Sequence, residues 1–194
     1  MYVQKLNPHP IIKQEDVFYK FNVFTKSQIY SLVKYIKENN KPYYDDGIDP
    51  QPNESIINRQ VWDMNFDSNP NMQNFQKILG EVTAEANKQF GFDIDYLGNL
   101  KYHEYGESNN HLEWHTDIGL GSACNRKLSF SIIVNNDYEG GQLEIMANSH
   151  KYKVPNFIGG MAIFPSFMMH RVTKVEKGVR NAIVGMWSGN RPFR

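Results

Sequence analysis

The second half of the chain, from Tyr96 onward, is a series of short segments that are rich in β-forming residues and separated by turn signals. The segments are LKYHEYG, LEWHTD, KLSFSIIV, GGQLEIM, HKYKV, GGMAIFP, MHRVTKV and VRNAIVGMW. Several short strands at this spacing are typical of an antiparallel sandwich or barrel. We therefore predict a small β-core in this half of the chain.

Before Tyr96, two segments carry apolar residues at helical spacing. Thr25 can cap a helix through KSQIYSLVKYIKENN, and a second helix is predicted roughly from Met72 to Phe90. The apolar faces are Ile29, Leu32, Val33 and Ile36 in the first helix, and Phe75, Ile78, Leu79, Val82 and Ala86 in the second. These amphipathic helices would buttress the sheets, which makes the fold class α+β.

Between the helices, residues Lys41 to Gln60 are rich in Pro, Asp, Asn and Gly. This composition predicts a long irregular connection. The connection is either a lid or binding loop, or simply a mobile link.

Composition excludes several classes of function. The 194 residues carry a formal net charge of +0, which gives no support for a nucleic-acid partner. The single cysteine, Cys124, allows no intrachain disulfide. We find no signal peptide and no apolar run long enough for a membrane span, so we expect a soluble cytoplasmic protein without a membrane partner.

A histidine and an aspartate stand two residues apart in WHTDIG, residues 114–119. Side chains alternate along a strand, so His115 and Asp117 point to the same face and can converge on one metal ion. The pair alone is a weak signal, because polar residues are common at strand ends. It needs a third ligand.

His170 is the best candidate for that third ligand. It follows the apolar segment GGMAIFPSFMM and opens the next strand, near the core, where an imidazole needs a partner. A buried histidine bonded to the backbone is the alternative. With His115 and Asp117 it gives two imidazoles and one carboxylate, the facial triad of Fe(II) oxygenases. Zinc accepts the same set, so the ligands alone do not choose the metal. The weaker candidates are His9, His103, His111 and His150.

An arginine follows at a suggestive distance. Arg180 comes after the turn Lys177-Gly178 and begins the next predicted strand, where it can lie beside the strand that carries His170. A guanidinium deep in a barrel is costly unless it meets an anion. No acidic residue nearby is an obvious partner, so either a dicarboxylic ligand binds it or it is a surface arginine on a hairpin.

From about Leu100 to Arg194, the chain resembles the iron(II)/2-oxoglutarate-dependent dioxygenases, and within them the prolyl-4-hydroxylase-like branch with its bacterial and phage hydroxylases. The resemblance rests on YHEYGESNNHLEWHTD, RKLSFSIIV, YEGGQLEI, VPNFIGGMAIFPSFMMHRVTKVEKGVR and VGMWSG. The specific combination is H-x-D, a G-G-x-L strand, F-P-S before the second histidine, and a basic residue ten positions after it.

The resemblance implies a double-stranded β-helix, or distorted jelly roll, in a single domain over residues 1–194. Helical support would come from about residues 1–95 and the metal-bearing β-core from about residues 96–194. The resemblance implies that His115, Asp117 and His170 hold Fe(II), and that Arg180 pairs with the distal carboxylate of 2-oxoglutarate. Tyr105, ten residues before the first ligand, would reach the same cosubstrate. Strand alternation adds looser candidates for the pocket wall: Ser129, Ser131, Ile133, Leu143 and Val172.

Two positions depart from the family pattern. Relatives often carry a tryptophan on the same inward face after the arginine, where this chain has Met186, with Trp187 one residue off. Many distant oxygenases have R-x-S, where this chain has Ala182. Both departures concern the shape of the pocket.

The family hydroxylates an unactivated C–H bond with O2 and converts 2-oxoglutarate to succinate and CO2. Asp117 favours hydroxylation, because related halogenases carry a small residue in its place. The resemblance favours C4 of a peptidyl proline, in a protein or peptide partner. The alternatives are an oxygenase that acts on another residue or on a small molecule, and a non-catalytic sensor of metal or 2-oxoglutarate. The sequence leaves open the oligomeric state and any need for ascorbate.

Overall fold

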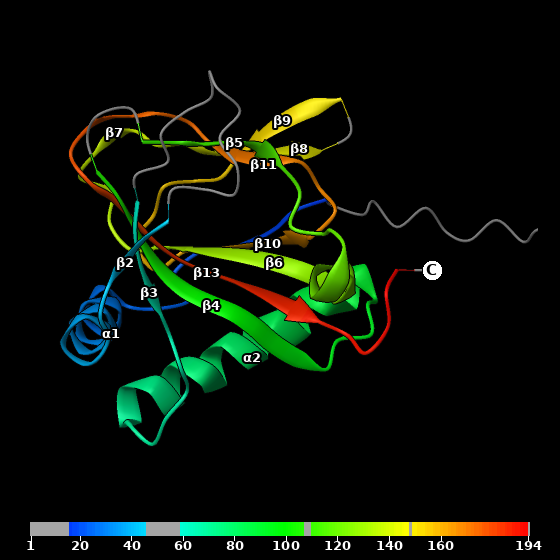
Figure 1. Ribbon diagram of the computed structural model, residues 1–194, viewed down its shortest axis with the longest axis horizontal. Helices are drawn as coiled ribbons and strands as arrows, with labels where there is room; N and C mark the ends of the chain where they lie inside the picture. Colours follow the sequence, from blue (N-terminus) through cyan, green and yellow to red (C-terminus); the bar gives the residue numbers. More distant parts are fainter. Residues whose placement is uncertain (1–15, 46–58, 107–109, 148, 194) are drawn as a thin grey trace, which may run out of the picture.

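The computed structural model describes residues 16–45, 59–106, 110–147 and 149–193. Its strands pair antiparallel and form two main sheets, and two helices cover the outer face of the larger sheet (Figure 1). The larger sheet runs in the order β1 (Phe18–Lys20), β10 (Met161–Pro165), β6 (Arg126–Ile133), β13 (Arg180–Ser188), β4 (Tyr96–Tyr105), β3 (Arg59–Asp63) and β2 (Tyr43–Asp45).

The smaller sheet faces the larger one from the side opposite the helices (Figure 1). It runs in the order β5 (Leu112–His115), β11 (His170–Val172), β8 (Leu143–Ala147) and β9 (His150–Lys153). A short ribbon of β12 (Val175–Lys177) and β7 (Glu139–Gly140), and a 3-10 turn at Gly121–Asn125, complete the elements of the described residues. The predicted α+β class, with a jelly-roll core buttressed by N-terminal helices, is confirmed.

Helix α1 spans Lys26–Asn39 and ends one residue before the predicted end, because Asn40 is its C-cap. Thr25 Oγ1 accepts from the backbone N–H of Gln28, and Gln28 Oε1 accepts from the backbone N–H of Thr25, which closes a capping box. The buried residues Ile29, Leu32 and Ile36 face the sheet, with Val33 partly buried beside them.

Helix α2 spans Pro70–Phe90 and begins two residues before the predicted start at Met72. Asn69 is its N-cap and accepts from the backbone N–H of Asn71 at 2.9 Å, while Pro70 occupies the first helical position, where a missing N–H costs nothing. The helix ends at Gly91, whose φ of 68° is left-handed. Among the described residues, neither helix is both long and apolar enough to cross a bilayer.

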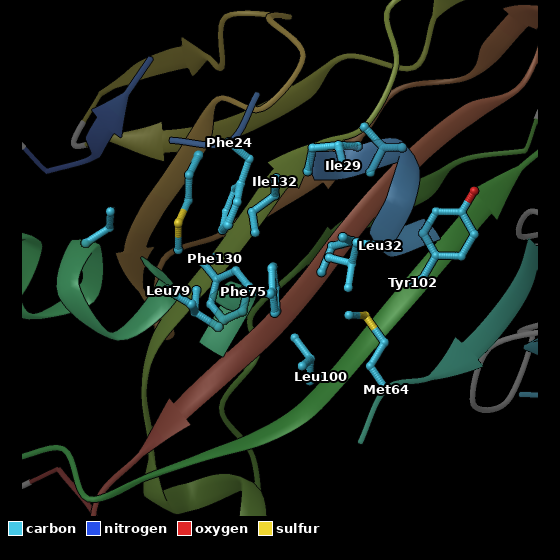
Figure 2. Packing of buried hydrophobic residues seen from close by; sticks show 14 of the residues in the cluster. Phe24, Ile29, Leu32, Met64, Phe75, Leu79, Leu100, Tyr102, Phe130 and Ile132 are labelled. Carbon is cyan, nitrogen blue, oxygen red and sulfur yellow. The ribbon is translucent and has the colours of Figure 1, made fainter. Parts of the chain in front are cut away.

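The main hydrophobic core lies between the helices and the larger sheet (Figure 2). Residues from both layers contribute to it, among them Phe24, Ile29, Leu32, Phe75, Leu79, Leu100, Tyr102, Phe130 and Ile132. Gly185 in β13 makes one close approach possible, because a Cβ atom there would lie 2.7 Å from Phe130 Cζ. The phenyl ring can therefore pack directly against the backbone of β13.

Alternation along the central strands separates this core from the space between the two sheets. In β6, Leu128 and Ile132 belong to the core on the helix side, whereas Ser129 and Ser131 line a cavity on the other side. In β10 and β4 as well, side chains point alternately into the core on the helix side and into the space between the sheets. A second apolar cluster fills the rest of the space between the sheets and includes Leu143, Ile145, Ala162, Phe164 and Val172.

The predicted irregular connection over Lys41 to Gln60 is wrong at both ends. Tyr43–Asp45 forms β2, and Arg59 opens β3, with Tyr43 opposite Val61. The β-forming tyrosines gain ladder hydrogen bonds from a partner strand that is distant in sequence, which local composition does not report. The middle of the segment, residues 46–58, lies outside the described residues, and so does the choice between lid and mobile link.

Candidate metal centre and adjoining pocket

The three predicted metal ligands come together at the edge of the smaller sheet. His115 is the last residue of β5, His170 is the first of β11, and the two lie opposite each other in the antiparallel pair. Asp117 follows β5, and its backbone N–H donates to the carbonyl of Ser166 at 2.9 Å. The Nε2 atom of His115 is 3.8 Å from Asp117 Oδ1, and that of His170 is 3.5 Å from Asp117 Oδ2.

One donor atom from each of the three side chains lies within 4.8 Å of the others. Two imidazole nitrogens and a carboxylate oxygen at this spacing can hold one divalent ion. The ligand set leaves further positions open on a six-coordinate metal. This set is the facial triad that the sequence predicts, and its assignment as the metal site stays a prediction.

The hydrogen bonds of both imidazoles fix which nitrogen is free. His115 Nδ1 lies 2.7 Å from the carbonyl of Glu113, and His170 Nδ1 lies 3.0 Å from the carbonyl of Met168. A carbonyl only accepts, so each Nδ1 carries the proton and each Nε2 of a neutral ring has a lone pair. Both lone pairs therefore belong to the nitrogens nearest Asp117, as metal ligation requires.

Burial lowers the pKa of the His115 imidazole, and the neighbouring His170 adds to the effect. The Asp117 carboxylate opposes this shift without reversing it. His115 is therefore neutral at neutral pH, the form in which an imidazole binds a metal.

The Asp117 carboxylate is held by a pair of buried serines. Ser129 Oγ donates to Asp117 Oδ2 at 2.5 Å and lies 2.9 Å from Ser166 Oγ. The Arg126 guanidinium donates to the backbone carbonyl of Asp117 at 2.8 Å. The side chain of Asp117 is thus bonded to Ser129 of β6, and its backbone is bonded to Arg126 of β6 and to Ser166 in the turn after β10. Together these contacts fix both parts of the residue.

The triad lines a cavity of about 100 Å³ between the two sheets. The other lining residues come from both walls: Arg59, His103, Tyr105, Leu112, Ser129, Phe130, Ser131, Leu143, Phe164, Val172, Arg180, Val184 and Met186. Apart from the triad, polar side chains enter this cavity from the larger sheet, and apolar ones enter it from both sheets. The pocket therefore combines polar and apolar walls beside the three predicted metal ligands.

Arg180 lies in this pocket, but not beside β11 as predicted. After β11 the chain pairs β12 with β7 and crosses to the other sheet, so that β13 lies between β4 and β6. Arg180 therefore faces the triad's sheet from the opposite wall. It is 2% exposed, its Cζ lies 5.1 Å from the Tyr105 ring centroid, and its Nε has no hydrogen-bond partner in the part of the chain that the structure describes.

A buried guanidinium with an unpaired nitrogen needs an anion, because desolvation of the charge is costly. The surface-hairpin alternative for Arg180 is wrong, since the side chain is buried. A carboxylate ligand in this pocket would satisfy it in a geometry that suits the planar guanidinium.

Of the other predicted pocket residues, Tyr105, Ser131, Leu143 and Val172 line the cavity together with the triad. Ile133 instead lines a smaller neighbouring cavity, which it shares with Leu143 and with the arginine of β13. Their roles toward a cosubstrate stay predictions.

Two further polar residues line the pocket: Arg59, which the sequence analysis does not single out, and His103, which it names only as a weaker candidate for the metal site. Arg59 stands opposite Tyr105 in the β3–β4 pair, and its Nη1 donates to Tyr105 Oη at 3.0 Å. His103 lies two residues before Tyr105 on the same face of β4. Because side chains alternate along a strand, the predicted place of Tyr105 in the pocket also predicts His103 there. Arg59 could not be predicted in the same way, because no local signal indicates that β3 pairs with β4.

Residues 100–188 match the model of the family described as the 2OG-Fe(II) oxygenase superfamily. Among curated proteins, a PKHD-type hydroxylase of Synechococcus sp. (strain CC9311) is 38% identical over 73 residues, which cover 37% of this chain and 33% of the relative. The match thus spans about a third of the length of that relative.

Solved structures share the fold at low identity. A Pseudomonas putida prolyl-4-hydroxylase matches with a TM-score of 0.73 at 13% identity, over 93% of this chain and 96% of that chain. A prolyl hydroxylase from Trichoplax adhaerens, solved in complex with a peptide fragment of a hypoxia inducible factor oxygen degradation domain, matches with a TM-score of 0.73 at 13% identity, over 91% and 85% of the two chains.

Proposed function

We propose that this chain is an Fe(II)- and 2-oxoglutarate-dependent dioxygenase, because residues 100–188 match the model of the 2OG-Fe(II) oxygenase superfamily. The proposal takes residues 1–194 as one catalytic domain. The observation that carries it is the pairing of His115, Asp117 and His170 with a buried, incompletely bonded Arg180 in one pocket.

The triad fits Fe(II) through its donor set. Both imidazoles have their Nδ1 protons engaged by backbone carbonyls, which leaves two neutral nitrogens beside one carboxylate. His115, Asp117 and His170 would hold the ion on one face and leave positions for a chelating cosubstrate and O2. The carboxylate also offsets part of the charge of the ion.

Arg180 would bind the distal carboxylate of 2-oxoglutarate from the opposite wall. Its guanidinium is already buried and stacked near the Tyr105 ring, so little side-chain freedom is lost on binding. When bound, Fe(II), 2-oxoglutarate and O2 would together supply the oxidising power for hydroxylation, with release of succinate and CO2. The apolar walls at Leu143, Phe164 and Val172 would exclude water from the reacting atoms.

The proposed substrate is a proline-containing peptide or protein, hydroxylated at C4. Support comes from the prolyl hydroxylases among the structural neighbours, one of them bound to a peptide, and from the PKHD-type hydroxylase among the relatives. A peptide would have to approach the triad from its open side, where the His115 side chain is 30% exposed while Asp117 and His170 are each 9% exposed.

The first test is an anaerobic titration with Fe(II) and 2-oxoglutarate, followed through the weak visible charge-transfer band of the chelated metal. The band should appear in the wild type and disappear in His115→Ala and His170→Ala. His150→Ala is the matched control, because His150 is exposed on β9. Iron binding without the band would refute the cosubstrate, and the absence of both would refute the metal site.

The second test concerns the substrate. Aerobic incubation with proline peptides should give succinate together with a peptide that has gained one oxygen atom, located by mass spectrometry. Parallel reactions with and without ascorbate would show whether it sustains turnover. Succinate formed without peptide oxidation would favour another substrate for the same metal and cosubstrate.

A further inference from the structure

Three buried polar atoms in the pocket lack a partner within the residues that the structure describes. They are His103 Nε2, Ser131 Oγ and Arg180 Nε. Buried polar atoms are almost always hydrogen-bonded, and each one left unpaired costs free energy. Three such atoms in one cavity indicate a polar ligand that is shared between them.

The residues directly opposite His103 in its own sheet offer no partner for Nε2. It is 5% exposed, and its neighbours across β3 and β13 are Val61 and Ala182, neither of which carries a polar side chain. The next residue in this row, Ile133 of β6, is apolar as well. A partner for His103 Nε2 must therefore come from the cavity.

A chain of contacts ends at the Nδ1 atom of His103. Arg59 Nη1 donates to Tyr105 Oη at 3.0 Å, and Tyr105 Oη lies 3.5 Å from His103 Nδ1. A guanidinium only donates, so the Tyr105 oxygen accepts from Arg59 and its own proton is available to His103 Nδ1. An imidazole that accepts at Nδ1 carries its single proton at Nε2.

The His103 ring is neutral. Burial lowers its pKa well below the ordinary value, and the positive charges of Arg59, Lys101 and Arg180 act in the same direction. When Nδ1 of the neutral ring accepts from Tyr105, the unpaired Nε2 is an N–H donor, and the unpaired Arg180 Nε is another. Two donors and a hydroxyl in one cavity match a carboxylate.

We infer that His103 is a cosubstrate-binding residue, whose Nε2–H donates to the distal carboxylate of 2-oxoglutarate beside Arg180, with Arg59 and Tyr105 holding it in that tautomer. The inference rests on the proposed function. It gives Tyr105 an additional task, since its hydroxyl proton orients the imidazole. It also gives Arg59 a positioning role, two hydrogen bonds away from His103.

The test compares two substitutions that preserve different halves of the imidazole. The amide nitrogen of Gln lies near the position of Nε2, whereas that of Asn lies near Nδ1. Calorimetric titration of the anaerobic Fe(II)-loaded protein with 2-oxoglutarate should show affinity weakened about tenfold or more in His103→Asn, the loss expected for one hydrogen bond to a charged group. His103→Gln should recover most of that affinity, and Fe(II) affinity without cosubstrate should not change in either variant.

The outcomes separate this inference from the function on which it rests. If the wild type does not bind 2-oxoglutarate, the proposed function fails. If it binds and both His103 variants bind equally well, His103 is not a ligand while the function stands. A loss of affinity that follows the melting temperatures of the two variants would also overturn the inference, because a purely structural role predicts that order.

Nitrogen NMR of the His103 ring gives a readout that is independent of turnover. The wild type should show a protonated Nε2 and an unprotonated Nδ1, and Tyr105→Phe should shift this balance by removing the donor to Nδ1. A protonated Nδ1 in the wild type would overturn the inference.

Discussion

Replacement of Ser129 by alanine removes the hydroxyl that donates to the carboxylate of Asp117, one of the three predicted metal ligands. Ser129 Oγ donates to Asp117 Oδ2 at 2.5 Å, and the two residues are 2% and 9% exposed. Water therefore has little access to replace the lost donor. The change should weaken Fe(II) binding, because a carboxylate without this hydrogen bond is less firmly oriented toward the two imidazoles.

The size of the effect follows from what remains after the substitution. A hydrogen bond to a charged group is worth about 1.5–3 kcal/mol, which corresponds to about a 10–100-fold change in affinity. Loss of a partner behind a metal ligand typically falls in the same range. In Ser129→Ala, the Asp117 backbone keeps its bonds to Ser166 and Arg126, so we expect the lower end, about tenfold.

Anaerobic competition of Fe(II) between the protein and a coloured chelator would measure this change. Ser131→Ala is the matched control: it lies two residues further along the same face of β6, it lines the same pocket, and its hydroxyl has no partner among the described residues. Its Fe(II) affinity should equal that of the wild type. Equal affinity in Ser129→Ala, or an equal loss in both variants, would refute the assigned role of the Ser129 hydroxyl.

Three further predictions follow from the pocket and the core. Arg180→Ala should lower the affinity for 2-oxoglutarate by about 10–100-fold, measured by calorimetry, and should leave the affinity for Fe(II) unchanged. An unchanged affinity for 2-oxoglutarate would mean that another residue binds its distal carboxylate. The fold lowers the pKa of His103 well below its ordinary value of 6.5. At pH values below 6.5 the unfolded chain therefore binds more protons than the folded one, and the free energy of unfolding should decrease as the pH is lowered. Urea titrations across that range should show this slope flattened in His103→Gln, and an unaltered slope would assign the effect to other groups. Gly185→Ala places a Cβ atom 2.7 Å from Phe130 Cζ and should cost about 1–3 kcal/mol of unfolding free energy; an unchanged urea midpoint would mean that the ring moves aside at no cost.

Local sequence signals were sufficient where the structure is itself local. Thr25 and Gln28 close the capping box of α1 within one turn, and the side chains of His115 and Asp117 share a face through simple alternation. The apolar pattern of α2 starts at its first buried residue, Met72, whereas the helix itself begins at Pro70 after the N-cap Asn69, so the pattern predicts the start two residues late.

Strand pairing limited the rest of the prediction. Whether Arg180 lies beside β11 or opposite it depends on the crossover through β12, which no residue near Arg180 reports. Arg59 reaches the pocket only because β3 pairs with β4, across more than thirty residues of sequence. The connection between the two strands contains helix α2, so this pairing leaves no local signature in the sequence of either strand.

The two halves of the pocket belong to different sheets. His115 and His170 stand on the smaller sheet, whereas Arg180 and His103 stand on the larger one, which also carries the helices and the main core. A ligand that spans from the ion to the arginine would therefore add a link between two layers that already meet through apolar side chains and through the hydrogen bonds of Ser129 and Arg126 to Asp117. Metal and cosubstrate should then protect the backbone amides of the smaller sheet from hydrogen exchange more together than either does alone, since only the two together span the pocket from the histidines to the arginine.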